Sequence, residues 1–475
     1  MRIARLYFYK FIIIASSLFV LPTTSIWFES RYLVPDLTPA PLLSSRLLKH
    51  PLYGGSFTFQ PFLMMSRSAY APFKDFRNSK QPLYDIGGSL DLLAYGTGLV
   101  DADFYDGTLL NQEVVSAGGG VAVQLEGYLD VSGVACNFVF SPWEGCTLGW
   151  SSSFYEARGL IEPTPRLLHA GMVGEYDELA APGIYDEFVQ GYANIMSLPS
   201  VGLNKLYYST KTMGDTELYI RFELGRDYCA RMRRLKGALQ AGTLLPTSPV
   251  EDINNLASFP TGCNGHFAVY AAGNIDLTLK EDMVWTVGGR AQNNFGRAML
   301  KRLAMLNQPN LIESFIIEVD AADVESNDAV AAQKIPVGEP VKYGVLQRNV
   351  YVSPGATWNI YSNLTLEGLR DGFGAKVGYS YVRHEKDNWF FDAFAEPTLL
   401  PYIESINRGI QEAQAYSAWS QGHFNVTLFY DFLRDAVSRS YEPFFAISLQ
   451  LPVDWLSSRA SAHSYGLSCI FELLY

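Results

Sequence analysis

The sequence predicts an all-β fold, a transmembrane antiparallel up-and-down β-barrel. Short segments in which apolar and polar residues alternate recur along most of the chain, and a period of two is the pattern of a strand with two different faces. Aromatic residues make up 14% of the 475 residues and charged residues only 18%, whereas charged residues are about 25% of an ordinary soluble domain. The mean hydropathy is nevertheless close to zero, as expected where lipid-facing apolar positions alternate with lumenal polar ones.

The first 25 residues predict a secretory signal peptide. Basic residues Arg2, Arg5 and Lys10 precede an apolar run at residues 11–21, and the segment contains no acidic residue. That run is shorter than the ~20 residues of a membrane-spanning helix, and a basic start before a short apolar core is typical of a signal peptide. We expect cleavage near Ser25, with an uncleaved anchor as the alternative.

The mature chain then begins with a segment of different character. Residues 26–55 alternate poorly, and we expect them to form a periplasmic or plug-like extension ahead of a barrel that covers residues 56–475. In the first half of that barrel the alternation predicts strands starting near residues 57, 86, 121, 134, 148, 203 and 217. A turn at Ser132-Gly133 separates two of them, and a helix-like patch at 185–196 lies in the irregular segment 158–200.

The run at 217–224 is the most informative of these. Apolar residues at its even positions alternate with Glu217, Tyr219, Arg221 and Glu223. A dry core could accept those charges only with dense pairing, whereas a water-filled lumen accepts them readily.

The second half repeats the pattern between longer inserts. Strands are predicted to start near residues 267, 283, 356, 372, 424, 445 and 465. The inserts are 229–263, with a basic patch at 231–236; 296–354, with a short amphipathic helix expected at 298–306 and an acidic patch at 320–328; and 385–421.

The predicted strands number about fourteen, with twelve to sixteen as the range. An even number suits a barrel whose two ends both lie in the periplasm. Alternate threading then places the long inserts outside, as extracellular loops carrying short helices, and the short links 141–146, 211–215, 280–281 and 368–372 on the periplasmic side. The long link 97–118 and the short turn 132–133 fall on the opposite sides from those expected, which indicates an error among the strands of the first third.

The last eleven residues form the clearest predicted strand. One face is wholly apolar or aromatic and carries Tyr465, Leu467, Phe471, Leu473 and the terminal Tyr475. This pattern resembles the C-terminal strand by which Gram-negative outer-membrane barrels are marked for assembly, in porins and fatty-acid transporters among others, without indicating one family. The resemblance implies an outer-membrane location, lipid contact and the barrel-assembly machinery as a partner. An inner strand of a secreted β-sandwich is the alternative for this segment alone.

The polar face of the strands supplies the candidate functional residues. Inward charges set the electrostatic field that a passing solute meets, although the same groups could instead pair with one another inside a plugged barrel. The predicted pore-lining residues are Glu126, Asp130, Glu217, Arg221, Glu223, Asp276, Asn359, Glu367, Lys376, Asp431 and Glu472. Carboxylates dominate this set, so the lumen is predicted to be electronegative.

Other functions find little support in the sequence. Without Arg2, Arg5 and Lys10, 33 of the 36 basic residues remain against 48 acidic ones, a net charge of −15, so binding to nucleic acid is not expected. The five cysteines form no metal or redox motif; Cys136 with Cys146, and Cys229 with Cys263, could form disulfides or remain separate thiols.

Catalysis is not expected either. Outer-membrane phospholipases carry a His-x-Ser pattern, whereas here His463 directly precedes Ser464 and no Asn partner is indicated by spacing. We therefore predict a non-enzyme without cofactor or metal: a channel or transporter for small solutes, weakly cation-preferring. A structural or surface-interaction barrel that uses its outer loops is the alternative, and a hydrolase comes third. The sequence indicates no oligomeric state.

Overall fold

The computed structural model describes the strands, the tight turns and part of the links between them. The described residues are 54–70, 80–82, 90–91, 121–167, 207–228, 234–302 except 254, 256, 257, 259, 260 and 281, 347–391 except 371, single positions between 403 and 414, and 417–432, 442–453 and 462–475. The predicted signal peptide, almost all of the predicted 26–55 extension and the patches at 185–196 and 320–328 lie outside these residues.

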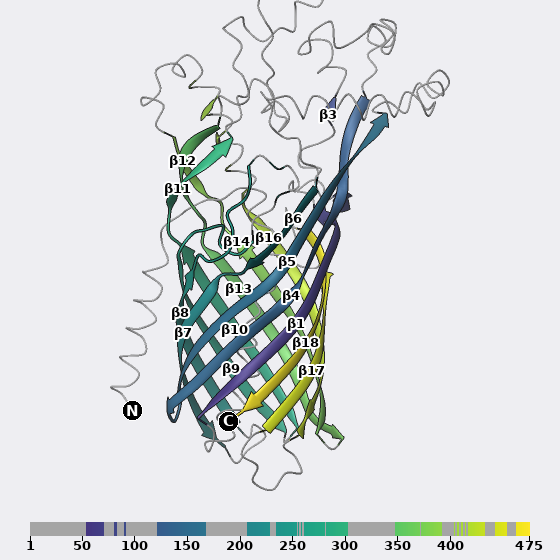
Figure 1. Ribbon diagram of the computed structural model, residues 1–475. Helices are drawn as coiled ribbons and strands as arrows, with labels where there is room; N and C mark the ends of the chain where they lie inside the picture. The colour runs from purple at the N-terminus through teal and green to yellow at the C-terminus, as the bar shows by residue number, and fades with distance from the viewer. Residues whose placement is uncertain are drawn as a thin grey trace, which may run out of the picture.

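Twelve strands close into an antiparallel barrel (Figure 1). Each pairs with its neighbours in the wall, and β1 pairs with both β18 and β4, which closes the ring. The strands are β1 (Gly55–Tyr70), β4 (Val121–Trp143), β5 (Cys146–Leu167), β7 (Thr216–Asp227), β8 (Arg234–Leu245), β9 (Ala268–Lys280), β10 (Met283–Asn294), β13 (Thr357–Arg370), β14 (Phe373–His384), β16 (Trp419–Asp431), β17 (Glu442–Val453) and β18 (Ala462–Leu474).

Both ends of the barrel chain lie at one end of the barrel, here called the base, and the opposite end is called the mouth. At the base, the backbone N–H of Gly55 donates to the carbonyl of Tyr475 and the N–H of Tyr475 donates to the carbonyl of Gly55, both at 3.0 Å. The Tyr475 ring lies against Gly55, where a Cβ would come within 3.0 Å of it. The last residue of the chain therefore completes the seam between the first and last strands.

The strand count corrects the predicted fourteen to twelve, within the predicted range. Residues 121–143 form one continuous strand, because Gly133 lies opposite Tyr155 of β5 and a Cβ there would collide with β5. That glycine allows close strand approach and makes no turn. The strand predicted near 203 is β6 (Tyr207–Met213), outside the closed ring. The run near 86 lies outside the described residues apart from β3 (Leu90–Asp91), beside the start of β4.

Two further segments differ from prediction. The insert 229–263 contains barrel strand β8, whose many Gly and Ala residues obscure the alternation. The helix expected at 298–306 is contradicted by β11 (Arg297–Arg302), in which buried Met299 and Lys301 alternate with exposed Leu300. β11 pairs with β12 (Gln347–Ser353), and β12 pairs with β15 (Asn388–Phe390), in a separate sheet near the mouth (Figure 1).

A bulge joins β6 to β7. Met213 pairs with Phe154 of β5 and Glu217 pairs with Ser151, so four steps along β6 and β7 oppose three steps along β5. One extra residue of this kind bends a strand and redirects a side chain. Here the bend lets β6 follow β5 beyond the wall toward the mouth, and it turns Asp215 toward the interior. The predicted periplasmic link 211–215 is therefore at the mouth end.

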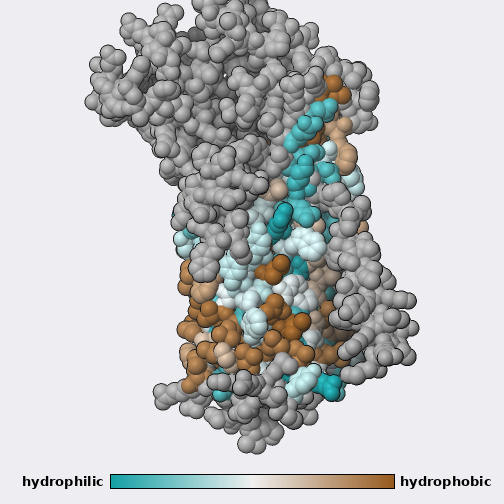
Figure 2. Space-filling view, turned by 180° about the vertical axis from the view of Figure 1, so that it is seen from behind, coloured by the Kyte–Doolittle hydropathy of each residue, from teal (hydrophilic) through white to brown (hydrophobic). Residues whose placement is uncertain are grey.

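The outer face of the barrel is apolar. Large hydrophobic side chains alternate with buried ones on nearly every wall strand. On the face shown in Figure 2 they gather in a brown band across the lower part of the barrel. Aromatic residues are concentrated near the base: Phe140, Trp143, Phe373, Tyr430, Phe432 and Tyr475. This band and its aromatic edge are the features of a wall that contacts lipid. Among the described residues, no helix is long and apolar enough to cross a bilayer.

Tight turns at the base depend on glycine. Gly145, between β4 and β5, has φ +77° and Gly372, before β14, has φ +86°, a region that residues with a Cβ rarely adopt. The nearby Cys136 and Cys146 are separate thiols, so the first of the two disulfides considered is absent. Cys229 lies outside the described residues.

Candidate lumenal site

The barrel encloses a cavity of about 370 Å³. Its lining comes from the inward faces of the wall strands and from part of the β8–β9 link (residues 246–267). Two sides of this interior differ in chemistry. The charged wall consists of inward residues of β7 to β10: Glu217, Arg221, Glu223, Lys236, Asp276 and Arg290. The neutral wall consists of the uncharged polar residues that line the cavity from β1, β13, β14, β16, β17 and β18: Gln60, Asn363, Ser380, Asn425, Thr427, Ser448, Gln450 and Ser468.

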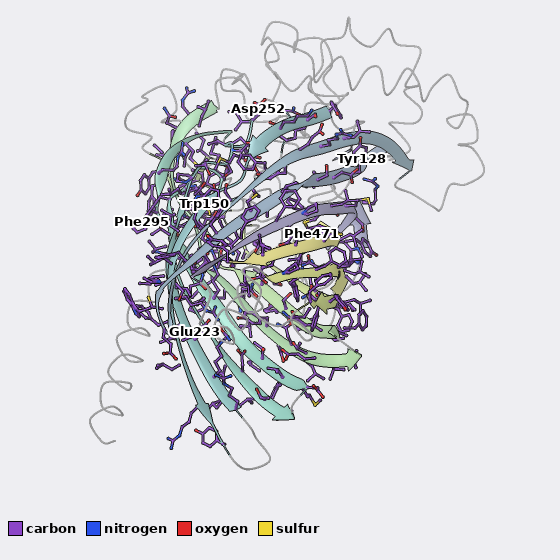
Figure 3. The ribbon with its side chains drawn as sticks, turned by 60° about the horizontal axis from the view of Figure 1, so that its bottom comes forward. Tyr128, Trp150, Glu223, Asp252, Phe295 and Phe471 are labelled. Carbon is purple, nitrogen blue, oxygen red and sulfur yellow. The ribbon has the colours of Figure 1, made fainter. Side chains whose placement is uncertain are left out.

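One cluster of the charged wall centres on Glu223. Its carboxylate accepts from Arg221 Nε at 2.5 Å and lies 2.8 Å from Lys236 Nζ, and all three side chains are almost completely buried. A second guanidinium nitrogen of Arg221 donates to Asn274 Oδ1 at 2.9 Å, and Asn274 Nδ2 donates to Asp276 at 3.0 Å. In Figure 3, Glu223 of β7 and Phe471 of β18 mark two sides of the barrel.

A second cluster centres on Tyr270. Its hydroxyl donates to Glu217 and accepts from Gln240 Nε2 at 2.6 Å. The Arg290 guanidinium lies 3.7 Å from the centre of the Tyr270 ring and 3.6 Å from Glu217 Oε1. Cation–π contact and ion pairing together hold Arg290 against the wall. The two clusters place opposite charges side by side, so most of the wall's charge is balanced locally.

The neutral wall is a ladder of hydroxyl and amide side chains. Across neighbouring strands, Asn425 Nδ2 donates to Ser380 Oγ at 3.1 Å, and the hydroxyls of Thr427 and Ser448 lie 2.9 Å apart. Gln60 Nε2 likewise donates to Ser468 Oγ at 3.1 Å. These groups can exchange hydrogen bonds with a polar solute without imposing a charge on it.

The mouth side of the cavity is covered by the β8–β9 link. Asp215, at the bulge, accepts from the backbone N–H of Ser248 at 3.1 Å, from its hydroxyl at 2.7 Å, and from the N–H of Cys263 at 2.5 Å. Gly262 has φ +65°, and a Cβ there would collide with the Asp215 carboxylate. The bulge therefore fixes the link over the cavity, and Thr261, Gly262 and Cys263 contribute to its lining.

Toward the base, the inward faces of β16, β17 and β18 carry an apolar cluster beside the inward carboxylates Asp431 and Glu472. Phe429, Phe444, Ala446 and Ile470 form a buried cluster on β16, β17 and β18, with the two phenylalanine ring centroids 5.6 Å apart. Ile470 also lines the cavity. Apolar side chains on one side of the lumen reduce the space that water can fill there.

Most predicted pore-lining residues lie on inward faces. Nine do so by strand alternation: Glu217, Arg221, Glu223, Asp276, Asn359, Glu367, Lys376, Asp431 and Glu472. Of these, the cavity lining includes Glu217, Arg221, Asn359 and Lys376. That any of them lines a conducting pathway remains a prediction. The side chain of Glu126 is outside the described residues.

Asp130 was assigned to the wrong face. It pairs in register with the outward Met65 of β1 and forms an ion pair with Arg67 at 3.0 Å on the outside of the barrel. The neighbouring Leu129 and Val131 are fully buried instead. The apolar side of β4 therefore faces inward near the mouth, the reverse of its orientation near the base.

The sequence reasoning missed two cations of the charged wall. Lys236 belongs to the basic patch at 231–236. It lies two residues after the inward Arg234, so the strand period of two places it on the same inward face. Arg290 shares the inward side of β10 with Thr286 and Gln292. Because all three side chains are polar and lie at even-numbered positions, the alternation could have assigned Arg290 to the lumen.

The remaining predicted residues can also be located. The terminal-strand residues Tyr465, Leu467, Phe471, Leu473 and Tyr475 all face outward and are exposed, and their role in assembly remains a prediction. Ser464 faces inward, accepts from Gln421 Nε2 at 3.1 Å and lies 3.5 Å from His423 Nε2. Among the described residues, no group of three or more His, Cys, Asp or Glu side chains could hold a metal ion.

A closed antiparallel barrel with an even number of strands, an apolar outer band and a polar interior has the construction of outer-membrane β-barrel proteins. No protein-family model and no curated protein matches the chain.

Solved structures similar to this chain are outer-membrane barrels. An outer-membrane channel from Pseudomonas putida F1 gives a TM-score of 0.43 at 8% identity, covering 89% of this chain and 96% of that chain. A Pseudomonas aeruginosa FadL homologue gives 0.30 at 10% identity, covering 96% and 99%. OprD of the same species gives 0.25 at 8% identity, covering 94% and 97%. All three TM-scores are below 0.5, and the barrel fold is defined by the strand pairing itself.

Proposed function

We propose that this protein is an outer-membrane channel or transporter for small solutes. The observation that supports this most directly is the cavity of about 370 Å³ inside a closed barrel, lined by hydroxyl, amide and charged side chains. A volume of this order is in the range of small-molecule sites. The proposal gives the interior a binding and passage role and assigns it no catalysis, cofactor or metal.

The orientation follows from the two ends of the barrel. The base carries both chain ends of the barrel and the tight turns at Gly145 and Gly372, and short turns are typical of the periplasmic side. The mouth carries the small sheet of β11, β12 and β15 and the extensions of β4, β5 and β6. We therefore place the base in the periplasm, the mouth outside and lipid around the apolar band.

Weak cation preference is the finer part of the proposal. Seven described carboxylates face inward: Asp215, Glu217, Glu223, Asp276, Glu367, Asp431 and Glu472. Five basic side chains oppose them: Arg221, Arg234, Lys236, Arg290 and Lys376. The difference, five minus seven, is −2. A lumen of small negative charge concentrates cations slightly.

Recording from planar bilayers tests the channel itself. Full-length protein purified from membranes should give stable single-channel currents, and liposomes that contain it should swell in isotonic sugar solutions. A protein that remains folded in the bilayer but passes neither ions nor sugars would contradict the proposal.

A surface-interaction barrel is the second candidate. The sheet of β11, β12 and β15, together with β6, provides ordered strand surface beyond the closed wall at the mouth. Absence of conductance together with retained binding to a macromolecular surface would favour this function.

A further inference from the structure

We propose that the lumenal cavity binds small solutes that carry an anionic, carboxylate-type group, and that Lys376 holds this group. The inference depends on the proposed channel function and names the class of solute for the same interior.

The charge of the cavity lining differs in sign from that of the whole lumen. Among the residues that the structure describes, two carboxylates line the cavity, Asp215 and Glu217, against three cations, Arg221, Arg290 and Lys376. Their sum is +1. The other inward carboxylates, Glu223, Asp276, Glu367, Asp431 and Glu472, are not part of the lining. A solute that fills the cavity therefore meets a lining of net positive charge. A small ion that crosses the full length of the lumen meets a net negative charge.

Four of the five lining charges are already engaged. Arg221 is paired with Glu223 and bonded to Asn274. Arg290 and Glu217 are both bound to the Tyr270 cluster. Asp215 accepts three hydrogen bonds from the β8–β9 link.

Lys376 is different. It makes no hydrogen bond or ion pair with any other residue that the structure describes. Asp276 acts on it electrostatically but lies beyond ion-pair distance. Within the described lining, Lys376 is thus the cation that is available to a solute.

The surroundings of Lys376 shape its environment. On the inward side of β14 it stands between Gly374 and Gly378, where added Cβ atoms would collide with the Phe429 ring and the Asn363 amide oxygen respectively. These neighbouring side chains lie over the two glycines and flank the lysine. Its cross-strand partners are Thr365 and Thr427.

An amine framed by amide and hydroxyl groups suits a particular kind of ligand. The charge-assisted bond to Lys376 would hold the anionic group, and the neutral wall would exchange hydrogen bonds with a polar body. Lys376 lies on β14, among the strands that carry the neutral wall. A solute bound to it would therefore lie between Lys376 and the charged wall opposite, whose charges are already paired with one another.

Glucuronate and glucose provide matched probes, because the first carries a carboxylate where the second carries a hydroxymethyl group. We expect wild-type protein in liposomes to admit glucuronate, and glucuronate to reduce the single-channel current with an apparent affinity about tenfold above that of glucose. Lys376→Gln should reduce the affinity for glucuronate to about that of glucose and leave glucose unchanged. Lys376→Arg should retain most of the difference.

Arg67→Gln is the control, since it removes the same charge from the outside of the barrel, and we expect no change in either affinity. Equal affinities of wild type for both probes, or an equal effect of Lys376→Gln on both, would overturn the inference while leaving a functioning channel for glucose. Absence of all flux and current would instead overturn the channel function, and the inference with it. Heat-modifiable migration of each variant on gels confirms that it has folded.

Discussion

Asp387 is a fully buried carboxylate near the mouth, held by its neighbours on two strand links. Its Oδ1 accepts from the N–H of Gly355 at 2.7 Å and lies 3.1 Å from His384 Nε2. The other ring nitrogen, His384 Nδ1, lies 2.8 Å from the hydroxyl of Thr357, which lines the cavity. The network therefore joins the start of β13 to the end of β14.

Asp387→Ala should destabilise the protein by about 2 to 4 kcal/mol, because a buried N–H and a buried imidazole lose their acceptor together. The midpoint of urea unfolding in lipid vesicles measures this. Lys386→Ala, at the exposed neighbouring position, should leave the midpoint almost unchanged. Equal midpoints for the two variants would show that the network contributes nothing.

The two faces of one strand make a second test at the residue scale. Leu428 faces outward in the apolar band, whereas the adjacent Thr427 faces the lumen. Leu428→Arg should cost about 2 to 4 kcal/mol by placing a charge in lipid, and Thr427→Arg should cost much less because its side chain enters a polar interior. Leu277 and Asp276 on β9 form a comparable pair, with the added loss of a carboxylate near Lys236. Similar urea midpoints for both members of a pair would contradict the lipid assignment.

At the scale of the element, β18 is the strand that closes the ring. It pairs with β17 on one side and with β1 on the other, and its outward Phe471 packs against Phe59 and Phe445. We predict that replacing Phe471 and Tyr475 together by Ser sharply lowers the amount of protein in the outer membrane, because the interfacial aromatics and the assembly signal are lost at once.

Immunoblots of membrane fractions measure that level. Leu449→Ser on β17 removes a similarly exposed apolar side chain without touching the terminal strand, and it should reach the membrane normally. Normal abundance of the double Ser variant would be incompatible with an assembly role for these residues.

The elements also show how far the sequence could predict the fold. Strands with large outward residues, such as β9 and β16, were located from their alternation alone. β8 was missed because Gly237, Ala238, Ala241 and Gly242 are small on both faces, so the period of two carries almost no contrast there. Gly133 was read as a turn because glycine has two uses, φ above zero and close approach, and only the partner strand distinguishes them.

The sequence predicts which face of the barrel wall a site residue occupies, but it does not predict which site residues contact one another. Alternation placed nine of the eleven predicted pore-lining residues on inward faces, since side-chain direction in a strand depends only on parity and phase. Asp130 was placed inward because polar residues were assumed to face the lumen along the whole of β4. Near the mouth, above the lipid band, the apolar residues of β4 face inward and the polar ones face outward. The contact of Glu223 with Lys236 joins the consecutive strands β7 and β8, and that of Glu217 with Tyr270 joins β7 to β9, so both depend on the register of β8, the strand that alternation does not reveal.

At the scale of the whole molecule, the arrangement of charge makes a prediction about ion selectivity. The sequence alone predicts an electronegative interior with weak cation preference. Asp130 outside, and Arg234, Lys236 and Arg290 inside, reduce the inward excess to two carboxylates among the described residues. Reversal potentials in a potassium chloride gradient should therefore show weak cation preference, stronger at low ionic strength because screening lengthens as salt falls.

The source of the preference can be located as well. Asp431 and Glu472 face inward near the base, outside the cavity lining, so Asp431→Asn with Glu472→Gln should abolish the preference by bringing five cations against five carboxylates. Asp130→Asn removes a carboxylate from the outer surface and should leave the reversal potential unchanged. Lys376→Gln should shift it further toward cations. Anion preference of the wild type at low salt would show that the inward charges described here do not set the field along the conducting path.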